Sequence, residues 1–93
     1  MNHHPSSSWP EVLTIAGFDP SAGAGIAADL KTFAAHVCYG VGAITALTVQ
    51  NTQGVTDLRP TEPEVLKGTI ASLLEDGQVK AILFSLLMLG CMQ

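Results

Sequence analysis

The chain has 93 residues, of which 47% are apolar and only 13% charged, a balance that suits one small globular domain and excludes a disordered chain. Eight acidic side chains outnumber four basic ones, the net charge is −4, and the basic residues do not cluster. Because no basic patch is present to neutralise a phosphate backbone, nucleic acid is not an expected partner.

Residues 1–11 are expected to form a flexible leader, because histidines, serines and prolines stand where a secretory signal needs a basic start and an apolar centre. Neither Cys38 nor Cys91 has the spacing of a zinc or redox motif, so no metal site is expected and both are interpreted as small buried side chains in a cytoplasmic protein. The apolar run AILFSLLMLGCM, residues 81–92, is shorter than the ~20 residues that span a bilayer, so no membrane segment is expected.

The first element is a short apolar run, residues 12–17, which is rich in β-branched residues and ends at a glycine. This pattern favours a strand that is buried on both faces, as in a parallel sheet. A Gly-rich turn follows at residues 18–25, and a helix should begin near Gly23 or Ala24. Its predicted apolar stripe consists of Ile26, Leu30, Phe33 and Val37. His36 is expected at the surface, near the end of this helix.

The second half of the chain predicts a strand over residues 41–50 and an edge strand or extended connection over residues 55–59. Thr61 and Glu64 have the spacing of a capping box, so they should open a helix that runs to about Asp76. The apolar face expected for that helix is formed by Leu66, Ile70, Leu73 and Leu74. A buried strand should follow, and the alternation of elements predicts a parallel α/β unit with right-handed crossovers.

Polar and small residues are predicted to gather where the first two strands end. The Gly-rich turn presents free backbone N–H groups beside a helix start, although its glycines could serve the turn conformation alone. The two common phosphate-binding signatures are absent. Gln50 ends the second strand at the same edge, where its amide could pair with an aminopyrimidine or simply occupy a turn. Asp29 borders the apolar stripe of the first helix, near the strand ends. It is either a site residue or an acid that the helix start favours.

Three segments closely resemble the N-terminal part of the hydroxymethylpyrimidine/phosphomethylpyrimidine kinases of thiamine biosynthesis. They read LTIAGFDPSAGAGIAADLKTFAA, AITALTVQNTQGV and PTEPEVL. The resemblance runs from Leu13 to about Asp76. It implies a ribokinase-like (Rossmann-like) α/β fold, with a parallel sheet and flanking helices, of which residues 12–93 are the N-terminal part only.

The same resemblance implies a chemistry and a set of site residues. Family members use ATP and Mg2+ to phosphorylate 4-amino-5-hydroxymethyl-2-methylpyrimidine and then its monophosphate. By position, Gly17 and Ala24 correspond to pocket residues beside the pyrimidine, Asp29 to a pocket carboxylate, and Gln50 to the side chain that bonds the pyrimidine edge. The family's catalytic aspartate belongs to its C-terminal part, so no catalytic residue is expected within this chain.

Two departures from the family pattern qualify these expectations. Val37 and Cys38 stand where the family usually has glycine and valine, and residues 82–93 replace the segment that follows the fourth strand. The chain is therefore expected to be incomplete and inactive alone, with an apolar edge at residues 83–89 that promotes self-association or a homo-oligomer. The alternative is a non-catalytic α/β module that binds a pyrimidine or another protein.

Overall fold

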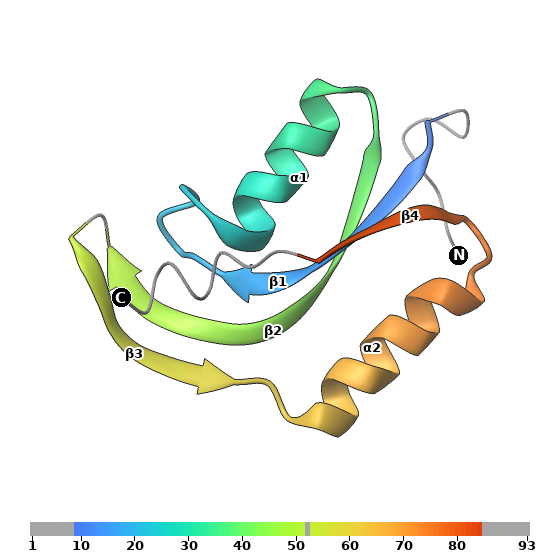
Figure 1. The fold of residues 1–93 in the computed structure, drawn as a ribbon. Coiled ribbons are helices and arrows are strands. Elements are labelled where there is room, and N and C mark those ends of the chain that lie inside the picture. Colours follow the sequence, from blue (N-terminus) through green and yellow to red (C-terminus); the bar gives the residue numbers. More distant parts are fainter. Residues whose placement is uncertain (1–8, 52, 85–93) are drawn as a thin grey trace.

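The computed structural model describes residues 9–51 and 53–84. Within them the elements in chain order are β1 (Glu11–Phe18), α1 (Gly25–Ala35), β2 (Tyr39–Asn51), β3 (Gly54–Pro60), α2 (Pro63–Glu75) and β4 (Val79–Phe84). The strands form one sheet in the order β3-β2-β1-β4, with a helix on each face (Figure 1). The predicted α/β class is confirmed. The expectations for residues 1–8, for residues 85–93 and for Cys91 lie outside the described residues.

Strand direction differs within this sheet. β1 is parallel to both β2 and β4, as predicted, whereas β3 pairs antiparallel with the second half of β2. Only residues 52–53 separate β2 from β3, and such a short connection permits antiparallel pairing alone. The expected edge strand at residues 55–59 is thus confirmed, as part of a β-hairpin added to a parallel unit.

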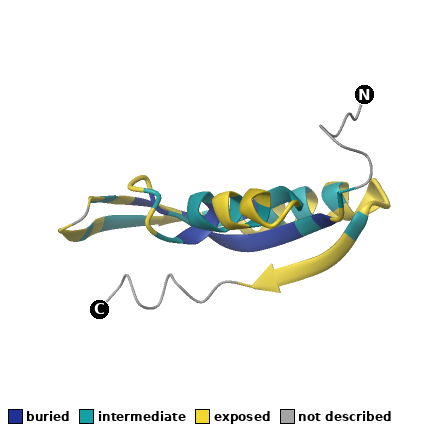
Figure 2. Ribbon diagram, turned by 90° about the horizontal axis from the view of Figure 1, so that it is seen from above, coloured by how far each residue is buried: buried dark blue, intermediate teal, exposed yellow. Residues whose placement is uncertain are grey.

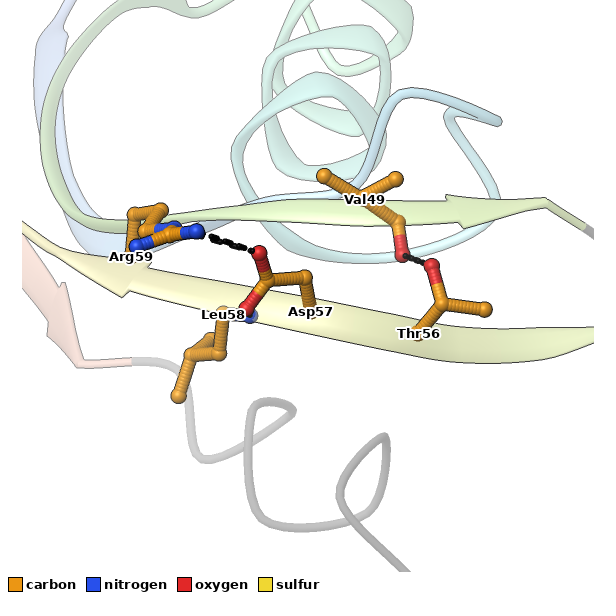
Figure 3. Close-up of polar contacts among 5 residues, drawn as sticks. All are labelled: Val49, Thr56, Asp57, Leu58 and Arg59. Atoms are coloured by element: carbon orange, nitrogen blue, oxygen red, sulfur yellow. Dashed lines mark hydrogen bonds and ion pairs between the residues drawn. The ribbon is translucent and has the colours of Figure 1, made fainter.

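Side chains of the edge strand β3 make an ion pair and a hydrogen bond (Figure 3). Asp57 Oδ2 lies 2.8 Å from an Arg59 guanidinium nitrogen, and Thr56 donates a hydrogen bond of 2.9 Å from its hydroxyl to the Val49 carbonyl. The ion pair is exposed and contributes little to stability. Charged side chains on an edge strand do, however, discourage further strand pairing there.

β1 forms the centre of the molecule and is buried along almost its whole length, which confirms a strand covered on both faces. On one face, α1 packs closely on β2 because Gly40 has no side chain. A Cβ at Gly40 would lie only 2.7 Å from Leu30 Cδ2 and 2.9 Å from Phe33 Cδ2. On the other face, α2 covers a core made by Leu13, Ile15 and Ala43 with Leu66, Ile70 and Leu73.

α1 ends earlier than its apolar pattern predicts. The helix stops at Ala35, His36 caps it, and Val37 is 54% exposed with a φ of 60°. The N–H of Cys38 donates to the Phe33 carbonyl, and that of Val37 to the Ala34 carbonyl, a Schellman arrangement that requires a left-handed residue after the cap. Placing Val37 on the buried stripe was therefore wrong, because the chain reverses there.

Two smaller expectations concern the neighbours of Val37. His36 is exposed at the helix end, as predicted, and its Nδ1 lies 2.9 Å from the Thr32 carbonyl oxygen. Cys38 is half-buried, not fully buried, because it follows the reversal at the rim of the sheet. Its thiol faces the His36 carbonyl at 3.7 Å, a weak contact.

Replacing Val37 with glycine should stabilise the chain by about 1 kcal/mol, because a left-handed residue with a side chain costs ~1–2 kcal/mol and Val37 buries little surface. The midpoint of urea unfolding measures this gain. Val37→Ala keeps a Cβ and should gain less. A lower midpoint for the glycine variant would contradict the strain.

α2 starts without the predicted capping box. The helix begins at Pro63 with Glu62 as its N-cap, and no side chain caps its free N–H groups. Thr61 instead belongs to the connection from β3, where its N–H donates to the Thr45 carbonyl at 2.9 Å. Proline at the first helical position lacks an N–H, so one fewer backbone N–H group needs a hydrogen bond from a capping side chain. Leu74, assigned to the apolar face, is 43% exposed.

The expectation of a buried strand is wrong for β4, whereas the exposed apolar edge expected at residues 83–89 is confirmed for Leu83 and Phe84, the part of that range that the structure describes. From Lys80 onward every described residue of the strand is exposed, and Phe84 is 67% exposed. Figure 2 shows this strand as an exposed edge beside the buried centre of the sheet. Among the strands that the structure describes, β4 has a neighbour on one side only, and this position leaves its side chains exposed.

Candidate functional site

The turn between β1 and α1 is organised by Asp19, which is only 5% exposed. Its Oδ1 accepts hydrogen bonds from the Ser21 N–H at 2.8 Å and from the Ser21 hydroxyl at 2.6 Å, and its carbonyl accepts from the Ala22 N–H. The sequence analysis did not single out Asp19. The available signal was an aspartate two residues before serine in a Gly-rich turn, since aspartate side chains commonly bond the backbone two residues onward.

Gly17 and Gly25 bring the end of β1 against the start of α1. Gly25 has a φ of +67°, and a Cβ there would lie 2.3 Å from the Gly17 carbonyl oxygen. Ala24, the N-cap, has extended backbone and no side-chain cap. The helix therefore begins near Gly23 or Ala24 as predicted, and its first N–H groups lie at the carboxyl end of β1.

Gln50 lies near the end of β2 and is tied to β1 through Thr48. The Thr48 side-chain oxygen lies 2.7 Å from Gln50 Oε1 and 2.9 Å from the Phe18 carbonyl oxygen. Thr48 is only 8% exposed. Gln50 and the Gly-rich turn thus lie at the same edge of the sheet, as predicted. The sequence analysis missed Thr48, although it lies two residues before Gln50 and so on the same face of the strand.

Asp29 lies farther back, over the middle of β1. Its Oδ2 accepts a hydrogen bond of 2.6 Å from the hydroxyl of Thr14, which is fully buried. Thr14 is three residues before Gly17, a separation of about 10 Å along a strand. Asp29 is the fifth residue of α1 and the first turn holds no acid, so proximity to the helix start does not explain its placement.

The predicted residues therefore fall into two sets. Gly17, Ala24 and Gln50 lie where β1 and β2 end, whereas the carboxylate of Asp29 is engaged with Thr14 below them. A separate apolar groove between β2 and α2 contains none of these four; it is lined by Gly42, Ile44, Leu47, Thr61, Val65 and Thr69.

Two further findings concern the described residues. In residues 9–51 and 53–84, no three His, Cys, Asp or Glu side chains gather as they would around a metal ion. The helices in this part of the chain are also too short or too polar to cross a membrane.

Known proteins are similar to this chain in sequence and in fold. A family model described as phosphomethylpyrimidine kinase matches residues 19–88. The Escherichia coli hydroxymethylpyrimidine/phosphomethylpyrimidine kinase is 51% identical over 67 residues, which cover 72% of this chain and 25% of that protein. The crystal structure of a phosphomethylpyrimidine kinase from Clostridium difficile is 45% identical with a TM-score of 0.78, and the match covers 81% of this chain and 32% of that one.

A more distant structure is the Staphylococcus aureus pyridoxal kinase in complex with AMP-PCP and pyridoxal. It is 38% identical, with a TM-score of 0.75, and the match covers 85% of this chain and 30% of the kinase. The present chain thus spans a quarter to a third of the length of these relatives. The shared fold is ribokinase-like. Because the family model matches residues 19–88, which are most of the chain and include the end of β2, the chain belongs to the phosphomethylpyrimidine kinase family.

Proposed function

We propose that this chain supplies the pyrimidine-binding part of an ATP-dependent kinase of thiamine biosynthesis. The reaction is phosphorylation of 4-amino-5-hydroxymethyl-2-methylpyrimidine and then of its monophosphate. The observation that carries the proposal is the placement of Gln50, through Thr48, beside the glycine-rich end of β1. A planar ligand can approach the backbone there because Gly17 has no side chain, and a cytoplasmic location suits such an enzyme.

Each predicted residue has a role in this proposal. Gln50 offers a donor and an acceptor side by side, which matches the amino group and adjacent ring nitrogen of the aminopyrimidine. Gly17 and Ala24 leave room for the ring. Asp29 contributes a negative charge behind the pocket, oriented by the Thr14 hydroxyl. Charge-assisted hydrogen bonds of this kind are short and comparatively strong, so the carboxylate is held in one orientation.

ATP and Mg2+ belong to the proposal for the whole kinase. AMP-PCP occupies the related pyridoxal kinase. The described residues of the present chain do not gather the carboxylates that would suit a magnesium site. We assign this part of the protein to pyrimidine binding on the placement of Gln50, and we attribute no step of phosphoryl transfer to it.

A chimera tests the proposal. When this chain replaces the matching segment of the Escherichia coli relative, the product should phosphorylate the aminopyrimidine alcohol with ATP. Isothermal titration with the same alcohol accompanies the assay. A folded chimera that neither binds nor phosphorylates the alcohol would contradict the proposal, whereas binding without turnover would favour the non-catalytic module.

In the active chimera, Gln50→Leu should raise the KM for the aminopyrimidine alcohol about 5- to 150-fold, because unpaired buried polar groups cost ~1–3 kcal/mol. The KM for ATP should not change. Gln53→Leu is the matched control, since Gln53 is exposed in the hairpin connection. Steady-state kinetics with each substrate varied in turn measures both constants.

Asp29→Asn preserves shape but removes the charge. If the carboxylate acts electrostatically, kcat should fall more than the KM for the alcohol rises. Equal kinetics for this variant, for Gln50→Leu and for the parent chimera would refute the residue assignments.

A further inference from the structure

The hydroxyl of Thr48 makes two short oxygen contacts with a single proton. It lies 2.9 Å from the Phe18 carbonyl oxygen and 2.7 Å from Gln50 Oε1. Both neighbours accept hydrogen bonds, but a hydroxyl can donate only one at a time. In one of the two contacts, therefore, two oxygen atoms would lie close together with no proton between them. This happens at a site where Thr48 is only 8% exposed. Such an arrangement is costly in a buried place.

One rearrangement satisfies both contacts. The Phe18 oxygen is always an acceptor, so the Thr48 proton goes to it. The Gln50 carboxamide can then turn half a revolution about its Cγ–Cδ bond, which places Nε2 beside Thr48 and lets it donate to the hydroxyl oxygen. Amide oxygen and nitrogen are nearly equal in shape, so this turn needs no other movement.

We propose that Thr48 is a positioning residue that fixes the carboxamide of Gln50 with Nε2 toward the strand and Oε1 toward the ligand. The inference rests on the proposed function for the identity of that ligand. Nε2 has two protons, and the one pointing away from Oε1 is used by Thr48. The outward edge of the amide then presents Oε1 and the remaining N–H together.

This orientation has a consequence for specificity. Oε1 accepts from the exocyclic amino group of an aminopyrimidine while the outward N–H donates to the neighbouring ring nitrogen. The opposite orientation would use Oε1 on Thr48 and weaken the acceptor that selects the amino group. Thr48 would thereby help the site prefer a 4-aminopyrimidine to an analogue that lacks the amino group, although Thr48 itself need not touch the ligand.

The first test uses the 93-residue chain without ligand. In a nuclear Overhauser spectrum of 15N-labelled protein, the Gln50 side-chain N–H protons should give cross-peaks to the Thr48 methyl group. Thr48→Val removes the hydroxyl at nearly constant shape, and the Gln50 amide signals should move toward those of a free glutamine. Thr48→Ser should keep them in place. Unchanged Gln50 signals in the valine variant, with folded backbone signals, would overturn the proposal.

The second test titrates the same three proteins with the aminopyrimidine alcohol and with its analogue lacking the 4-amino group, read on the Gln50 side-chain signals. The wild-type chain and Thr48→Ser should prefer the amino compound about tenfold, the value of roughly one hydrogen bond. Thr48→Val should reduce that preference to about twofold. Equal preference in all three proteins would also overturn the proposal. If neither compound shifts Gln50 while the first test succeeds, the orientation stands and the proposed function fails.

Discussion

Gly25→Ala should destabilise the chain by about 2–5 kcal/mol. The new Cβ would lie 2.3 Å from the Gly17 carbonyl oxygen, which is backbone at the end of the central strand and cannot move aside as a side chain would. Overpacking of this kind costs ~1–3 kcal/mol, and the left-handed conformation adds ~1–2 kcal/mol for a residue with a side chain. Urea unfolding followed by circular dichroism measures the loss. Because small domains are only marginally stable, we expect the variant to be largely unfolded in buffer.

Gly68→Ala is the matched control for that experiment. Gly68 lies in the interior of α2, and a Cβ there meets nothing within 4 Å. The same substitution should therefore stabilise the chain by ~0.5–1 kcal/mol through helix propensity. If the two variants shifted the unfolding midpoint in the same direction, the close approach of α1 to β1 at Gly17 would not be the cause.

Self-association of the 93-residue chain is expected to increase with concentration, because β4 leaves an unpaired apolar edge. Ile82, Leu83 and Phe84 are all more than two-fifths exposed, and an apolar strand edge can pair with another chain. Phe84→Lys should raise the concentration at which the chain associates by about tenfold or more, since lysine on an edge strand opposes pairing. Sedimentation velocity over a range of concentrations gives this midpoint.

Leu74→Lys provides the comparison for the edge. Leu74 is 43% exposed and gains the same charge, but it lies on α2 and not on a strand edge. Its effect on the midpoint should be small. A concentration-independent monomer for the unmodified chain, or equal effects of the two lysines, would show that β4 does not drive association.

The elements were predictable where one physical signal dominated. The β-branched run before Gly17 favoured a buried strand, and the spacing of Ile26, Leu30 and Phe33 indicated one helical face. Val37 continued the same spacing but is itself the left-handed residue at which the chain reverses, and that reversal depends on backbone hydrogen bonds that no apolar pattern contains. The expectation that β4 is buried was wrong for a different reason. The burial of a strand depends on which other elements cover it, and the composition of the strand does not reveal those elements.

The site was predictable to the level of the sheet edge. Parallel strands end together, so the turn after Gly17 and the residue Gln50 had to approach each other. Two contacts could not be predicted: the one between the Thr48 hydroxyl and Gln50, and the one between the Thr14 hydroxyl and Asp29. Both depend on the register between distant segments of the chain. A single sequence does not give that register to within one residue, and a shift of one residue turns every side chain to the other face.

The position of β1 within the sheet also affects how the protein folds during synthesis. β1 leaves the ribosome before the other described elements, yet one of its two partners, β4, follows it by 68 residues in the pairing of Glu11 with Val79. At roughly 5–20 residues per second, β1 therefore waits several seconds for its second neighbour. Throughout that interval one backbone edge of β1 has no strand partner, so we expect the nascent chain to bind chaperones that recognise extended apolar segments.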